Sequence, residues 1–90
     1  MKSLELSHSD SKKLEILDFI SDGKWYSFYS VHTGLGMNYI TTKKQLRFLE
    51  LLELVETLTI SEEESATGKA VRKVRIARRG KELLDALKKD

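Results

Sequence analysis

The chain has 90 residues, no cysteine and a formal net charge of +2, which allows a single domain with a modest core and excludes disulfides and thiolate metal sites. Only two histidines are present, His8 and His32, and neither has carboxylates at the spacing of metal ligands, so we expect no metal and no cofactor. No segment approaches the roughly 18 apolar residues of a membrane span, and the N-terminus has no apolar segment of the secretory kind, so we expect a cytoplasmic protein.

The small net charge hides an uneven distribution along the chain. Residues 50–66 contain six acidic residues and no basic one, whereas residues 67–90 contain nine basic and three acidic residues. Because both signs are concentrated, the net charge understates the charge of any local basic surface.

The first part of the chain predicts a tail, a helix and a brief strand. Residues 1–10 supply no core and are predicted to form a flexible tail, so we expect the domain to span residues 11–90. Apolar residues at helical spacing predict a first helix over residues 11–21, and the turn signal Asp22-Gly23 ends it. The aromatic stretch at residues 24–26 predicts a short strand.

The middle of the chain predicts two helices joined by a turn. Ser27 can cap a short helix over residues 28–33, and the two glycines within residues 34–37 permit the positive φ angles of a turn. Asn38 can cap a third helix over about residues 38–53. Its apolar stripe, with one threonine, consists of Thr42, Leu46, Leu49 and Leu52.

The C-terminal part predicts a hairpin followed by a helix. Strand-like alternation covers residues 54–60 and 70–77 around a polar loop, and a last helix is expected over residues 78–89. The predicted fold class is α+β, mostly helical: a winged helix-turn-helix with a three-helix core, a two-stranded hairpin as the wing (residues 54–77) and a C-terminal helix.

Basic residues gather opposite the apolar stripe of the third helix and on the hairpin. If that helix enters a major groove, Arg47 can pair with a guanine edge or a phosphate, and Thr41 and Lys43 can contact phosphates. A solvated surface without a ligand is the alternative. The predicted DNA-binding residues are Tyr39, Thr41, Lys43, Lys44, Arg47, Arg72, Lys73 and Arg75.

The remaining features favour interactions other than catalysis. The acidic hairpin tip, Glu62, Glu63 and Glu64, would repel phosphates, so a protein-interaction module or a component of a larger DNA-processing complex is an alternative function. A homodimer could form through the last helix or through an exposed apolar pair on the third helix. The candidate contact residues are Leu83, Leu84 and Leu87 in the first case and Phe48 and Leu51 in the second.

The other chemistry-bearing residues carry no enzyme prediction. The aromatic cluster of Trp25, Tyr26, Phe28 and Tyr29 is interpreted as core and its rim, with stacking on nucleic-acid bases as the alternative. His32 stands near Ser30 and Thr33 without an acidic partner at a suitable spacing. No catalytic set is present in the pattern, so we expect no enzyme.

Two stretches resemble winged-helix regulators. LELLELVE (residues 49–56) resembles the L-E-x-L-G-L-V-E passage between their recognition helix and wing, and IARRGKELL (residues 76–84) resembles the L-T-x-x-G-x-E-L-L start of their last helix. Over residues 11–88 the chain is similar to archaeal MarR-like or PadR-like regulators. The resemblance implies a transcriptional regulator that binds double-stranded DNA.

The chain departs from the family pattern at two capping positions. Glu53 replaces the usual glycine, so we expect the third helix to end without a left-handed cap. Ala77 replaces a capping threonine before the last helix.

Overall fold

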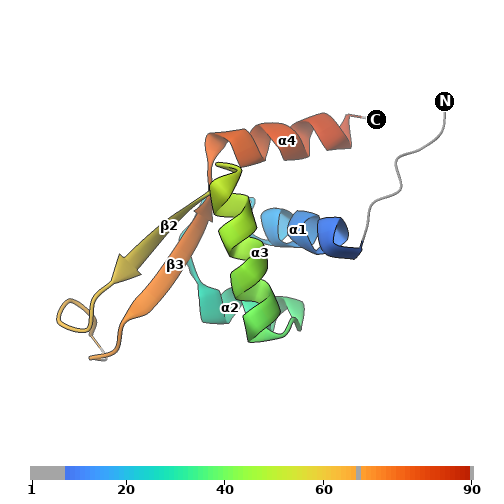
Figure 1. Ribbon diagram of the computed structural model, residues 1–90. Coiled ribbons are helices and arrows are strands. Elements are labelled where there is room, and N and C mark those ends of the chain that lie inside the picture. The colour runs from blue at the N-terminus through green and yellow to red at the C-terminus, as the bar shows by residue number, and fades with distance from the viewer. Residues whose placement is uncertain (1–7, 67, 90) are drawn as a thin grey trace.

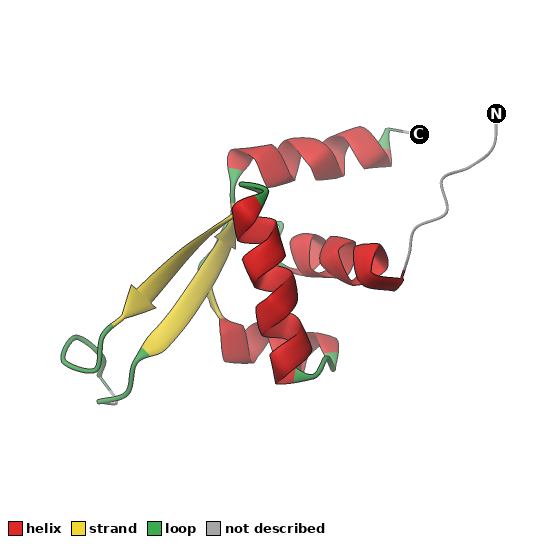
Figure 2. Cartoon of the chain, in the orientation of Figure 1, coloured by secondary structure: helices red, strands yellow, loops and turns green. Residues whose placement is uncertain are grey.

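The computed structural model describes residues 8–66 and 68–89. In chain order the elements are α1 (His8–Phe19), β1 (Tyr26–Ser27), α2 (Phe28–Leu35), α3 (Tyr39–Leu51), β2 (Val55–Ile60), β3 (Val71–Ile76) and α4 (Arg78–Lys88) (Figure 1). The predicted fold is confirmed: the described part is α+β, mostly helical, and has the winged-helix arrangement, with the β2–β3 hairpin projecting from a helical body (Figure 2).

The three strands form one antiparallel sheet in the order β1-β3-β2. Val55 pairs with Ile76, and Thr57 pairs with Val74, so these residues share the inner side of the sheet. Because successive side chains of a strand point to opposite faces, Arg72 lies on the inner side with Val74, whereas Lys73 and Arg75 lie on the outer side.

The core is formed where α1, α2 and α3 meet the inner side of the sheet. Its fully buried members are Ile16, Leu17, Ile20, Val31, Leu46, Leu49 and Val74. In α3 the buried stripe is Thr42, Leu46 and Leu49, as predicted, but Leu52 is 50% exposed and does not belong to it. The stripe fixes which side of α3 faces solvent.

Several helix boundaries differ from the sequence prediction, and α1 and α3 each end two residues earlier than expected, at Phe19 and Leu51. Helix α1 begins at His8, so residues 8–10 are helical and not part of a tail; Asp10 and Lys13 form an ion pair one turn apart, which supports this first turn. Residues 1–7 lie outside the described part. Helix α2 continues through Leu35, and Gly36 ends it with φ 64°, so the turn before α3 is shorter than predicted.

The end of α3 corrects another expectation. Glu53 adopts the left-handed conformation, with φ 61°. Its N–H donates to the carbonyl of Glu50 (2.9 Å), and the N–H of Leu54 donates to the carbonyl of Leu49 (2.9 Å). This is the Schellman pattern that glycine usually serves. The helix therefore has the left-handed cap, formed by a residue that pays roughly 1–2 kcal/mol for it.

Gly80 allows α4 to pack closely against the start of β2. A Cβ atom at this position would overlap the carbonyl oxygen of Leu54, so a side chain does not fit. The same carbonyl accepts a hydrogen bond from the N–H of Ala77 (3.0 Å), and Ala77 caps α4 without a side-chain bond. Helix α4 lies at the opposite end of the domain from α2 and the hairpin tip (Figure 1).

Candidate nucleic-acid interface

The N-terminal half of α3 is positioned by its cap and by its buried stripe. The Oδ1 atom of Asn38 accepts hydrogen bonds from the N–H groups of Ile40 (2.8 Å) and Thr41 (3.3 Å), which confirms the predicted cap. The Oγ1 atom of Thr42 donates to the carbonyl of Asn38 (2.9 Å). The first turn of α3 is therefore well defined, and its outer side is open to solvent.

The residues predicted from α3 lie together on that open side. Tyr39, Thr41, Lys43, Lys44 and Arg47 are all exposed. The Nζ atom of Lys43 lies 5.4 Å from the ring centre of Tyr39. Lys44 and Arg47 form no ion pair or hydrogen bond within residues 8–66 and 68–89, so their charges face solvent.

The hairpin divides its predicted cations between two faces. On the inner side, the guanidinium of Arg72 lies 4.7 Å from the ring centre of Phe28 and has no ion pair with a described residue. On the outer side, the Nε atom of Arg75 donates to Glu56 (2.8 Å), and its guanidinium lies 4.7 Å from the ring centre of Trp25. Lys73 is half-buried on the outer side. Of these three residues, Arg72 alone faces toward the start of α3.

Arg72 borders a cleft of about 440 Å³ between α2, the start of α3 and the hairpin. Two cations and three hydroxyl groups line it, and none of its described lining residues is acidic. The lining residues are Ser27, Phe28, Tyr29, Tyr39, Lys69, Ala70, Val71 and Arg72. The cleft joins the predicted residues Tyr39 and Arg72, which are 33 positions apart in the chain.

Tyr29 and Lys69 border this cleft and are missing from the predicted set. The sequence interpretation assigned Tyr29 to the aromatic core and its rim, but the side chain is 68% exposed, whereas Phe28 is buried. The helical spacing of Phe28 and Val31 was the available signal, because it places Tyr29 off the buried stripe of α2.

A row of aromatic rings connects α2 to the start of α3. The ring centre of His32 lies 5.1 Å from that of Tyr29 and 5.2 Å from that of Tyr39, both edge-on. The Nδ1 atom of His32 is 3.0 Å from the carbonyl oxygen of Met37. The imidazole thus stabilises the turn between α2 and α3. This structural contact accounts for a histidine at position 32 without a catalytic role. Within the described residues, no three histidine or acidic side chains gather as metal ligands would.

The acidic residues near the sheet are involved in local contacts. The Oγ atom of Ser61 donates to Glu64 (2.9 Å) at the hairpin tip, where Glu62 and Glu63 are exposed. At the start of β1, the hydroxyl of Tyr26 donates to Asp22 (2.6 Å), and this bond, with a second one from the N–H of Lys24 (3.0 Å), lowers the pKa of the Asp22 carboxyl.

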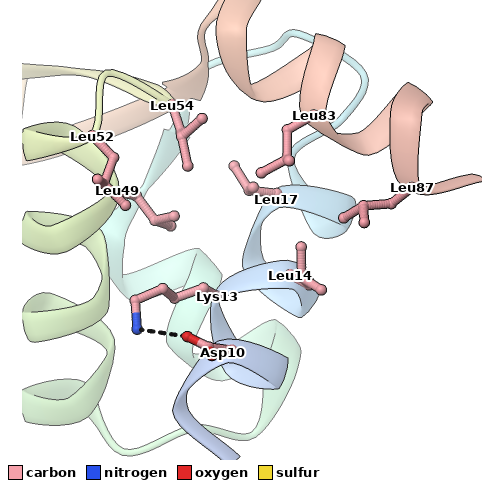
Figure 3. Close-up of a pocket in the computed structure, with 9 residues that line it drawn as sticks. All are labelled: Asp10, Lys13, Leu14, Leu17, Leu49, Leu52, Leu54, Leu83 and Leu87. Atoms are coloured by element: carbon pink, nitrogen blue, oxygen red, sulfur yellow. Dashed lines mark ion pairs between the residues drawn. The ribbon is translucent and has the colours of Figure 1, made fainter. Parts of the chain in front are cut away.

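A second, apolar groove of about 260 Å³ lies between α1, α4 and the C-terminal end of α3 (Figure 3). Asp10 and Lys13 form an ion pair at one end of it. The rest of its lining consists of seven leucines: Leu14, Leu17, Leu49, Leu52, Leu54, Leu83 and Leu87.

Exposed apolar side chains occur in this groove, at Leu52 and Leu87, and outside its lining on the last turns of α3, at Phe48 and Leu51. Phe48 is 57% exposed, Leu51 66% and Leu87 42%, so each is available to a partner. Leu84 is only 6% exposed and belongs to the core, so its predicted part in a dimer contact is wrong. We call Phe48, Leu51, Leu52 and Leu87, together with the groove, the apolar surface.

Comparison with solved structures shows a shared fold. The chain is similar to three structures of ZitR from Lactococcus lactis, a winged-helix regulator of the MarR family. An apo-form variant gives a TM-score of 0.71 at 14% identity over 90% of this chain and 57% of ZitR. The same variant in another structure gives 0.70 at 15% identity over 99% and 60%, and a further variant gives 0.65 at 17% identity over 87% and 49%.

These likenesses are structural and partial. The chain spans about half to three-fifths of the length of the ZitR chains. No family model matches the chain, and no curated protein matches it in sequence. In the described part, none of the helices is long and apolar enough to cross a membrane.

Proposed function

We propose that this protein binds double-stranded DNA as a transcriptional regulator and places the N-terminal half of α3 in the major groove. One observation carries the proposal: Lys44 and Arg47 extend from the exposed side of a rigidly capped helix and are not neutralised by any described residue. The fold shared with winged-helix regulators supports it.

The exposed residues of α3 divide into two roles in this proposal. Arg47 and Lys44 reach base edges, since arginine can bind a guanine edge through two hydrogen bonds. Thr41, Lys43 and the Tyr39 hydroxyl contact phosphates, which orient the protein on the duplex. Lys73 and Arg75 are secondary contacts, because they lie on the outer side of the sheet and Arg75 is already bonded to Glu56.

We further propose that two copies of the chain associate through the apolar surface. A symmetric pair can cover the same leucine-lined patch on both copies, which removes Phe48 and Leu51 from water. A small domain gains stability from such burial. The pair would then present two copies of α3 to a palindromic duplex.

The test of DNA binding is the double substitution Lys44→Ala and Arg47→Ala. We expect affinity for a duplex selected from a random pool to fall by about 100-fold or more, because two charged contacts are lost. The melting temperature should stay within about one degree, since both side chains are exposed. Fluorescence anisotropy and circular dichroism measure the two quantities.

The matched control is Arg79→Ala with Lys81→Ala, which removes the same charges from the exposed first turn of α4 at the far end of the domain. This control should retain DNA affinity within a few-fold at moderate salt. Unchanged affinity in the α3 variant, or equal loss in both variants, would contradict the proposed binding face.

The second candidate function is protein interaction through the hairpin tip. The exposed carboxylates of Glu62 and Glu63 favour it, because they would repel a phosphate backbone. A gel-shift with random duplex at low salt separates the two functions. No retardation at micromolar protein would favour the interaction module, including one that works within a larger DNA-processing complex.

A further inference from the structure

We propose that the cleft between α2 and the hairpin is a binding site for one backbone phosphate of duplex DNA, outside the groove that α3 enters. This inference rests on the proposed function and deepens it, because it names a second contact region and its ligand. The phosphate is held by the guanidinium of Arg72 and the ammonium of Lys69, with hydroxyl donors from Tyr29 and Tyr39.

The chemistry of the cleft wall matches a phosphodiester. Arg72 and Lys69 supply positive charge, and Tyr29 and Tyr39 each supply a hydroxyl donor, whereas the hydroxyl of Ser27 already donates to the Oγ atom of Ser30 (2.8 Å). No carboxylate belongs to the described wall, although acidic residues are common elsewhere on this chain. A phosphate entering the cleft therefore meets donors without a competing anion.

Arg72 is prepared for this role by its contact with Phe28. The guanidinium lies 4.7 Å from the ring centre, and Phe28 itself is buried and thus fixed. Stacking on a ring holds the guanidinium while its N–H edge stays available for hydrogen bonds. Arg75 shows the contrast, because its guanidinium also lies over a ring but its Nε already donates to Glu56.

The position of the cleft relates it to the recognition helix. Tyr39 is the first residue of α3 and also borders the cleft. A phosphate bound there therefore belongs to the DNA strand at the edge of the major groove that α3 enters. The edge-on contacts of His32 with Tyr29 and Tyr39 hold the two tyrosines at a fixed relation. The site thus sets the register and angle of α3 on the duplex without reading sequence.

The test compares Arg72→Gln with its matched control Arg79→Gln on a 20-base-pair duplex selected from a random pool; Arg79 is exposed at the start of α4 and does not line the cleft. We expect Arg72→Gln to weaken binding about tenfold, the loss of one charge-assisted hydrogen bond. It should also reduce the slope of log affinity against log salt by about one. Arg79→Gln should change affinity by less than about twofold at moderate salt.

A neutral phosphate analogue identifies the contacted atom. Single methylphosphonate linkages are placed in turn along the duplex. At one flanking position the linkage should weaken DNA binding by the wild-type protein but leave the affinity of Arg72→Gln unchanged. This is the behaviour of an interacting pair in a double-mutant cycle. Because Arg72 covers Phe28, Lys69→Gln and Tyr29→Phe are measured as well; both side chains are exposed and can be changed without harm to folding.

The possible failures are distinguishable. The phosphate site would be overturned, and DNA binding left intact, by the following result. Arg72→Gln, Lys69→Gln and Tyr29→Phe keep the wild-type affinity and salt slope, whereas the α3 double variant loses DNA affinity. Loss in neither set would overturn the proposed function itself. NMR can also show whether inorganic phosphate binds saturably in the cleft. If it does, and Arg72→Gln still binds DNA like the wild type, the cleft is a small-anion site and this inference is overturned.

Discussion

The two halves of α3 present different chemistry to solvent. Between Tyr39 and Arg47 the exposed side chains are mostly cationic or hydroxyl-bearing, whereas in the next turn Phe48, Leu51 and Leu52 are 57%, 66% and 50% exposed. The same buried stripe, centred on Leu46 and Leu49, anchors both halves. One helix therefore carries two separate surfaces in a fixed relation.

Because both halves share one buried stripe, the core does not determine which residues each half exposes. The stripe satisfies the core, and it would do so whatever residues stood opposite. An apolar patch that remains exposed in a small soluble domain marks a contact with a partner, and an unpaired basic patch marks a contact with an anion. Each surface should then be removable without loss of the other.

The largest expected effect comes from placing charge on the apolar half. In the double variant Phe48→Glu and Leu51→Glu, we expect the proposed dimer to dissociate, because two carboxylates would have to be buried on each copy. Affinity for a palindromic duplex should fall by about 100-fold more than affinity for a half-site, through lost bivalency. The half-site measurement corrects for the effect of a glutamate at position 51 on Arg47, one helical turn away. Analytical ultracentrifugation and anisotropy measure these changes.

The α3 double variant Lys44→Ala and Arg47→Ala is the reciprocal control for that experiment. It should lose DNA affinity and keep the mass of the wild-type protein. A dimer that survives Phe48→Glu and Leu51→Glu would mean that the apolar surface has another occupant, and the contrast between the halves would need a different explanation.

A smaller effect is expected at Gly80, which sets the distance between α4 and the apolar half. Gly80→Ala forces α4 away from the carbonyl of Leu54 and opens the groove between them. Overpacking of this kind costs about 1–3 kcal/mol of unfolding free energy, measurable by urea denaturation. Half-site DNA affinity should stay near wild type. A variant as stable as the wild type would show that α4 can shift without cost.

Much of the fold could be predicted because local signals agree with the tertiary arrangement. Ser27 and Asn38 are side-chain caps in the structure as in the sequence interpretation, and the spacing of Leu46 and Leu49 identified the buried side of α3. From strand alternation it also follows that Arg72 shares a face with Val74. These signals involve residues within one or two turns or strand steps of each other.

The remainder depends on contacts between distant residues. The ion pair of Arg75 with Glu56 spans 19 positions and requires the observed strand register. The cleft joins Tyr29 to Lys69 only after the hairpin has folded back toward α2. The left-handed conformation of Glu53 was missed because its residue type argues against it, and packing of Leu49 and Leu54 in the core overrides that preference.

That strained cap gives a stabilising prediction at the end of the apolar half. Glu53→Gly should raise the free energy of unfolding by about 1 kcal/mol, since glycine adopts positive φ without the Cβ clash. The melting temperature should rise by about 4–8 °C. Glu53→Ala is the control, because it removes the charge but keeps Cβ, and it should show no comparable gain. Equal stabilisation by both would assign the effect to charge.

The smallest effect is expected far from both halves, at Asp22 and Tyr26. The Tyr26 hydroxyl holds the pKa of Asp22 below its usual value of 3.8, so the folded state favours the carboxylate. The stability contributed by this pair is present above the unfolded pKa and is lost as the pH falls through the lower, folded pKa. Tyr26→Phe should raise the pKa of Asp22 toward 3.8, as measured by NMR titration of the carboxyl carbon.

Tyr29→Phe is the matched control for that titration, because its hydroxyl lies in the cleft and not at Asp22. It should leave the pKa of Asp22 unchanged, and Tyr26→Phe in turn should leave DNA affinity and mass unchanged, since the residue borders neither surface of α3. An unaltered Asp22 titration in Tyr26→Phe would mean that the N–H of Lys24 alone holds the carboxylate. A change in DNA affinity would instead show that the β1 edge, where Tyr26 pairs with Val74, transmits strain to the hairpin and so influences the DNA-binding surface.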